Sequence, residues 1–111
     1  MKRLLLVLVL ISSLAWSQTT AGYFYSHLTQ ATANNPLSVN PALLHTIVVN
    51  STTSGTIVVK DTLAADCSGG TAVTGTVTPA ANTTLTYDVT MAKGLCITTG
   101  GTIDITVSWR Y

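Results

Sequence analysis

The chain has 111 residues, of which 47% are hydrophobic and 8% are charged, and its formal net charge is +1. This length allows one domain, and the absence of glutamate together with abundant threonine favours strands over helices. Beyond residue 17, three cations stand against four carboxylates, which excludes the clustered positive charge that nucleic-acid binding requires. So little surface charge predicts self-association or docking on a larger protein assembly.

The N-terminal segment has the pattern of a secretory signal peptide. A short basic start precedes an apolar run over residues 4–11, and Ala15 and Ser17 supply small side chains before a cut after Ser17. An uncleaved anchor or a buried helix are the alternatives, but the run is shorter than the roughly 20 residues that span a bilayer. We therefore expect residues 1–17 to be a signal peptide, with no stable membrane span after its removal.

Residues 18–42 contain two prolines and no sustained periodicity, which predicts an extended N-terminal arm or linker with one short strand around 23–28. Three consecutive aromatic residues stand in this segment: Tyr23, Phe24 and Tyr25. They pack on the edge of the domain or form an interaction arm that reaches a neighbouring subunit.

The rest of the chain, residues 43–111, alternates apolar and polar residues with a period of two, which is typical of strands that bury one face. Six strands are predicted, over residues 43–50, 56–61, 71–78, 83–90, 95–99 and 103–111. Residues 51–55 and the pair Gly100-Gly101 predict two hairpin turns. A tight connection is predicted at 92–94.

This pattern predicts an all-β fold, a small antiparallel β-sandwich of about six to seven strands, jelly-roll-like or Ig-like. The last strand alternates most strictly. We expect four large side chains in the core: Ile105, Val107 and Trp109 from this strand, and Tyr87 from the strand predicted over 83–90.

Cys67 and Cys96 are the two cysteines of the chain. In an oxidising compartment a disulfide between them would close a loop of about 30 residues and contribute roughly 3–4 kcal/mol. The alternative is two separate buried thiols. A metal site is not expected, because neither cysteine has a second ligand at CxxC or CxxH spacing.

Residues that could support catalysis are few. His27 lies in the predicted arm, and His45 lies in a strand as a polar-face or core residue. Asp61 and Asp66 flank one loop and are candidates for a carboxylate pair or for Ca²⁺ ligands. The chain has no Glu and no aromatic cleft for the first role, and Ca²⁺ needs more oxygen ligands than two Asp provide, although backbone carbonyls could contribute. No phosphate loop, HExxH or GxSxG motif occurs. We therefore expect no enzymatic activity and no cofactor.

Two N-x-[ST] sequons begin at Asn50 and Asn82, both in predicted turns. Their modification depends on a host that glycosylates asparagine.

Five segments follow one another in an order that resembles a small β-sandwich module recurring in tailed-phage and prophage structural gene regions: residues 25–29, 44–50, 85–89, 94–97 and 104–111. The resemblance covers about 25–111. It implies a non-enzymatic virion component, of the head-decoration or tail-associated type, that works by packing in multiple copies. The apolar leader and the cysteine pair depart from it, because tailed-phage virions assemble in the cytoplasm.

The first interpretation is thus a structural or binding module, virion-related. The alternative is an exported bacterial cell-surface or filament subunit, adhesin-like and stabilised by the disulfide. A carbohydrate-binding module or small hydrolase ranks last, because it needs an aromatic platform or a carboxylate cleft. The expected location is exported, periplasmic or extracellular, or else virion-associated.

Overall fold

The computed structural model describes residues 22–29 and 32–111, which form one antiparallel sheet of six strands and contain no helix. The strands are β1 (Phe24–Leu28), β2 (Ala33–Ser38), β3 (Ala42–Asp61), β4 (Thr71–Ala72), β5 (Thr83–Met91) and β6 (Leu95–Arg110). The all-β prediction and the short strand predicted around residues 23–28 are confirmed. The signal peptide predicted over residues 1–17 lies outside the described residues.

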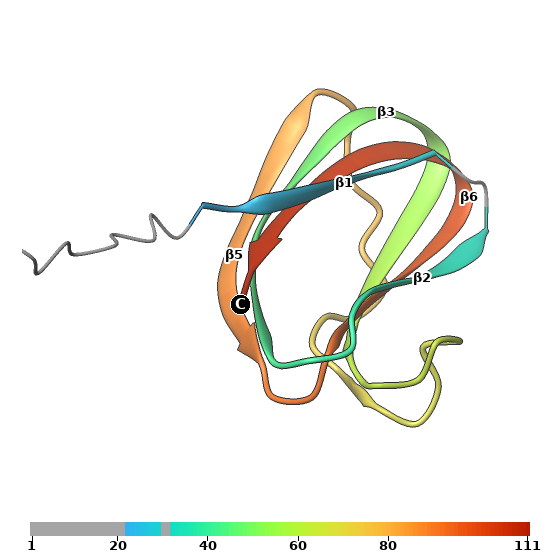
Figure 1. Ribbon diagram of the computed structural model, residues 1–111. Helices are drawn as coiled ribbons and strands as arrows, with labels where there is room; N and C mark the ends of the chain where they lie inside the picture. Colours follow the sequence, from blue (N-terminus) through green and yellow to red (C-terminus); the bar gives the residue numbers. More distant parts are fainter. Residues whose placement is uncertain (1–21, 30–31) are drawn as a thin grey trace, which may run out of the picture.

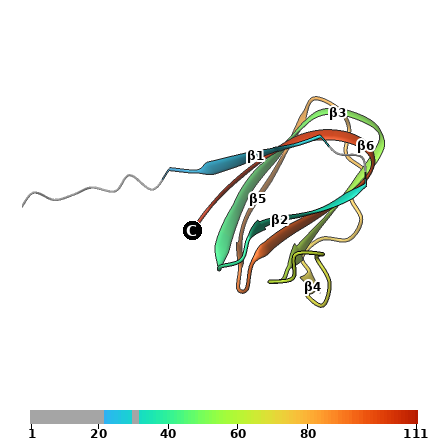
Figure 2. The same ribbon diagram turned by 45° about the vertical axis from the view of Figure 1, so that its right-hand side comes forward.

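Two long strands form the centre of the sheet. β3 and β6 pair from Leu43↔Arg110 to Asp61↔Leu95, and both run without a chain reversal. Figures 1 and 2 show them curving together, so that the two halves of the sheet face each other. The two hairpins predicted at residues 51–55 and at Gly100-Gly101 are therefore wrong, because each segment is a bend within a continuous strand.

The bend depends on close contact between the two strands. Gly101 has φ +64°, and a Cβ on Gly55 would lie 2.6 Å from the Cβ of Ile103. The register between the strands also shifts between Thr53 and Ser54. Glycine is required here because it adopts positive φ without strain and leaves room for the facing backbone.

The remaining strands line the two edges of this central pair. β1 and β2 pair with successive halves of β6, while β5 and β4 pair with successive halves of β3. Of the strand predicted over 71–78, two residues form β4, and Val77 adds a single bridge to Ile57. Within the segment 18–42, β1 is the short strand that the sequence predicts, whereas residues 33–38, which fall in the predicted arm or linker, form β2 of the sheet.

The buried apolar side chains form one cluster between the two halves of the sheet. Alternate residues of β6 supply much of it, and Ile105, Val107 and Trp109 are buried there as predicted. Tyr87 is only half-buried and packs against the margin of the cluster, because β5 is an edge strand. Burial raises the pKa of the Tyr87 hydroxyl.

The tight connection at residues 92–94 carries the chain from β5 to the start of β6. Backbone N–H groups of Ala92, Lys93 and Gly94 donate to the carboxylate of Asp61 at 2.8, 2.8 and 3.2 Å. Partial burial alone would raise the pKa of Asp61, but these three hydrogen bonds outweigh it and hold the pKa below its ordinary value. Asp61 is thus a structural residue that fixes this turn.

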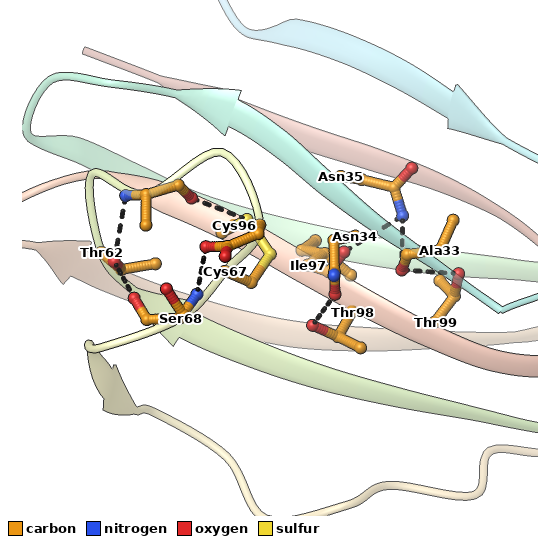
Figure 3. The surroundings of a disulfide bond; sticks show 12 residues. Ala33, Asn34, Asn35, Thr62, Cys67, Ser68, Cys96, Ile97, Thr98 and Thr99 are labelled. Atoms are coloured by element: carbon orange, nitrogen blue, oxygen red, sulfur yellow. Dashed lines mark hydrogen bonds between the residues drawn. A yellow bond between two sulfur atoms is a disulfide. The ribbon is translucent and has the colours of Figure 1, made fainter.

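Cys67 and Cys96 form a disulfide, with their Cα atoms 5.5 Å apart. Both cysteines are fully buried, and the bridge ties the loop after β3 to the start of β6 (Figure 3). Within that loop the hydroxyl of Thr62 donates to the Ser68 carbonyl at 2.8 Å. The predicted cysteine pair is confirmed, and it is compatible with an oxidising location.

Candidate functional site: an aromatic surface

Aromatic side chains gather where the start of β1 lies beside the end of β6. The pairing Phe24↔Trp109 places the two ends side by side. We define the aromatic surface by five residues: Tyr23, Phe24, Tyr25, Trp109 and Tyr111. Four of them are strongly exposed, with exposed fractions of 45% for Tyr23, 51% for Phe24, 77% for Tyr25 and 65% for Tyr111. Exposed aromatic side chains that gather at one end of a small domain, here on both sides of the sheet, mark a candidate interaction site.

Three of these rings contact one another on the core-facing side of the sheet. The ring centroid of Phe24 lies 5.1 Å from that of Trp109 and 5.6 Å from that of Tyr111, and the last two are 5.4 Å apart at an interplanar angle of 89°. Trp109 is 8% exposed and belongs to the core cluster. Edge-to-face contacts of this kind add to hydrophobic burial, so Trp109 anchors the two exposed rings to the core.

The indole Nε1 of Trp109 is buried without a hydrogen-bond partner among the residues that the structure describes. A buried polar group in this state has a free-energy cost. In this orientation the Trp109 ring contacts the rings of Phe24 and Tyr111.

Tyr23 lies on the opposite, outer side of the sheet. Its ring stacks on His45 with centroids 4.5 Å apart, and the guanidinium of Arg110 lies 5.1 Å from the Tyr23 ring centroid. His45 Nδ1 is also hydrogen-bonded to the carboxylate of Asp88. These contacts attach Tyr23, the residue before β1, to β3 and β6, and they join β3 to β5.

A second histidine, His27, attaches β1 to β6 near the other end of β1. His27 Nε2 and Asp104 Oδ1 lie 2.7 Å apart, and the amide of Asn50 donates to Asp104 Oδ1 at 2.8 Å and to Thr106 Oγ1 at 3.1 Å. The hydrogen bonds from Asn50 and then from His27 lower the pKa of the Asp104 carboxyl. The described contacts of both histidines therefore attach strands to one another.

An open groove of about 310 Å³ adjoins the aromatic surface. Its lining comes from Pro41, Ala42, Leu43, Thr90, Arg110 and Tyr111. Tyr111 belongs to both features, so the groove extends the aromatic surface toward the start of β3 and the end of β5.

The two carboxylates considered as a catalytic pair have separate partners. Asp61 accepts from the 92–94 turn, and Asp66 accepts from the backbone N–H of Ser68 at 3.0 Å. Hydrogen bonds from the side chain and backbone of Ser68 lower the pKa of Asp66. Within residues 22–29 and 32–111, no three or more His, Cys, Asp or Glu side chains are grouped as metal ligands would be.

The two sequons differ in their surroundings. The side-chain amide of Asn50 is engaged with Asp104 and Thr106 in the middle of the sheet. Asn82 is exposed in the turn before β5, where its backbone N–H donates to the Val49 carbonyl at 2.7 Å. Both asparagine residues are exposed, and the side-chain amide of Asn50 is engaged in contacts between β3 and β6.

Sequence reasoning selected the aromatic residues at positions 23–25 but not their neighbours at the other end of the chain. Trp109 was assigned to the core alone, and Tyr111 and Arg110 were given no role. The available signal was that aromatic residues stand near both ends of the domain, but only the pairing of β1 with β6 shows that the two ends meet.

The described part of the chain contains no helix that is long and apolar enough to cross a bilayer. Comparison with known proteins gave no match to any family model, to any curated protein or to any solved structure.

Proposed function

We propose that this protein is a non-enzymatic structural and binding module that acts by packing in multiple copies, as a virion component of the decoration or tail-associated type. The aromatic surface carries the proposal. A small domain exposes four aromatic rings at one end and carries little charge to oppose association. The virion setting is supported by the resemblance of residues 25–111 to a module from phage structural gene regions.

The architecture fits this role. The two facing halves of the bent sheet support assignment as a small β-sandwich, jelly-roll-like or Ig-like, and its histidines and carboxylates are engaged in contacts between strands and turns. Tyr25, at 77%, is the most exposed large hydrophobic side chain within residues 22–29 and 32–111. A protein partner that covers it removes apolar surface from water at about 25 cal/mol per Å².

Analytical ultracentrifugation of the protein, expressed as the full chain with its own N-terminal segment, tests the proposal. The average mass is measured over a wide concentration range. We expect the average mass to rise with concentration, and the double variant Tyr25→Ser/Tyr111→Ser to weaken this rise. Leu63→Ser is the matched control, because Leu63 is an exposed apolar residue, 57% exposed, in the loop after β3. A wild-type protein that stays monomeric at every concentration contradicts multi-copy packing.

The disulfide favours a second candidate, an exported cell-surface or filament subunit. A buried bridge is typical of small domains outside the cytoplasm, and virion assembly in the cytoplasm does not supply that environment. N-terminal sequencing of the native protein discriminates between the two functions. A start at Gln18 supports the exported subunit, and retention of Met1 contradicts it.

A further inference from the structure

We propose that two copies of this chain join edge to edge through β1, antiparallel, with the two-fold axis at Ser26. This inference rests on the proposed function, since it names the contact through which copies pack. Within the described residues β6 is the one strand that pairs with β1, so the other side of β1 is an open sheet edge.

The other edges carry features that prevent strand addition. β2 contains Pro36 and an irregular register, β5 contains Asp88 at φ +48° beside a register shift, and β4 has two residues. Proline, charge, irregularity and shortness all protect an edge. β1 has five residues without proline, lysine, aspartate or glutamate, so it is the unprotected edge of the described sheet.

The sequence of β1 is complementary to itself. In an antiparallel pair centred on Ser26, Phe24 faces Leu28 of the second copy, and Tyr25 faces His27 of the second copy. The register with β6 places Phe24, Ser26 and Leu28 on the core-facing side and the other two on the outer side. The apolar side chains of Phe24 and Leu28 thus face each other, and the ring of Tyr25 faces the imidazole of His27. Ser26, the smallest residue of β1, lies on the two-fold axis.

Charge also permits this pairing. His27 is the one side chain of β1 that can carry a positive charge, and it is already hydrogen-bonded to Asp104 of its own chain. In the proposed register it faces a tyrosine and not its own copy. No pair of like charges is brought together directly across the new contact.

The area involved indicates a weak dimer. Phe24 and Tyr25 are 51% and 77% exposed, so covering them buries roughly 250 Å² per copy, against the roughly 800 Å² per partner of a standard stable interface. We therefore expect a dissociation constant weaker than about 10 µM. Such a contact suits an assembly in which many weak contacts act together.

Cysteine cross-linking tests the register. Residues directly opposite in an antiparallel pair have Cα atoms about 4.5–5.5 Å apart, which a disulfide can span. In a glutathione buffer we expect Ser26→Cys to form covalent dimers roughly tenfold faster than Thr86→Cys, which places a thiol on the exposed face of β5. Peptide mapping of the intact Cys67–Cys96 bridge shows that each variant is folded.

Lysine variants give the second measurement. We expect Ser26→Lys to raise the dissociation constant about tenfold or more, because two lysines meet on the axis, while Thr86→Lys leaves it nearly unchanged. Association that persists in Ser26→Lys, without selective cross-linking of Ser26→Cys, overturns the β1 contact and leaves the proposed function standing. A wild-type chain that is monomeric throughout contradicts both.

Discussion

Removing the Cys67–Cys96 disulfide is expected to lower the free energy of unfolding substantially. The bridge has a sequence separation of 29. The chain entropy of closing a loop of that size corresponds to about 3.6 kcal/mol at 25 °C. A domain of this length has a total stability of about 4–13 kcal/mol, so the reduced protein keeps a thin margin or none. The melting temperature should fall by roughly 15–25 °C.

The assay compares three forms by urea and thermal unfolding: the oxidised protein, the reduced protein and the double variant Cys67→Ala/Cys96→Ala. Both cysteine side chains are buried, so the alanine variant should lose a further contribution of about 1 kcal/mol per missing sulfur. The reduced protein isolates the covalent effect. Reductant must leave the alanine variant unchanged, which serves as the internal control.

The result that refutes this reasoning is a reduced protein whose stability lies within about 1 kcal/mol of the oxidised form. In that case the unfolded chain is already restricted in this region, and the loop-closure argument does not apply. The existence of the bridge is checked separately, by a mass increase of about 2 Da on reduction, since two sulfurs each gain one hydrogen.

Three further predictions concern the sheet. Gly94→Ala should destabilise the fold by about 1–3 kcal/mol in urea unfolding, because the new Cβ would lie 2.5 Å from the Ser38 carbonyl oxygen and 2.6 Å from that of Thr62; an unchanged midpoint contradicts the close packing. Ile105→Ala, at a fully buried site, should lose about 2–5 kcal/mol in the same assay, and a loss below that range means the site is looser than described. The lowered pKa of Asp61 stabilises the folded state at pH values above the ordinary pKa of 3.8, and this contribution disappears as the pH falls through the lowered pKa. The variant Asp61→Asn should therefore be less stable at neutral pH, and its free energy of unfolding should depend less on pH between pH 5 and pH 2. Parallel plots of the free energy of unfolding against pH for the two proteins would contradict the assignment.

Only part of the candidate site could be predicted from the sequence. The triplet at residues 23–25 is conspicuous by composition, and the sequence predicts a contact segment there because the triplet lies outside the strongest strands. The contribution of Tyr111 to the aromatic surface could not be predicted, because it depends on which strand lies beside β1. Phe24 and Tyr111 are far apart in the chain, yet their ring centroids lie 5.6 Å apart.

The sequence by itself determined which residues face the core, because alternation along a strand is a local property. It also contained evidence against the hairpin predicted at Gly100-Gly101. A two-residue turn there would place Ile97 opposite Asp104, on one face, whereas the apolar residues keep the same parity from Leu95 to Trp109. That parity indicates one continuous strand, as the structure shows.

Only the tertiary structure decided whether residues 51–55 form a hairpin turn or part of a continuous strand. A hairpin there would pair Val49 with Ile57, apolar with apolar, and a continuous strand buries the same two residues, so the pattern fits both arrangements. In the structure Val49 pairs with Ile105 and Ile57 with Thr99. The physical reason is that alternation specifies the face of each side chain, while the choice of neighbouring strand depends on contacts between segments far apart in the chain. The aromatic surface and the open edge of β1 both follow from that choice.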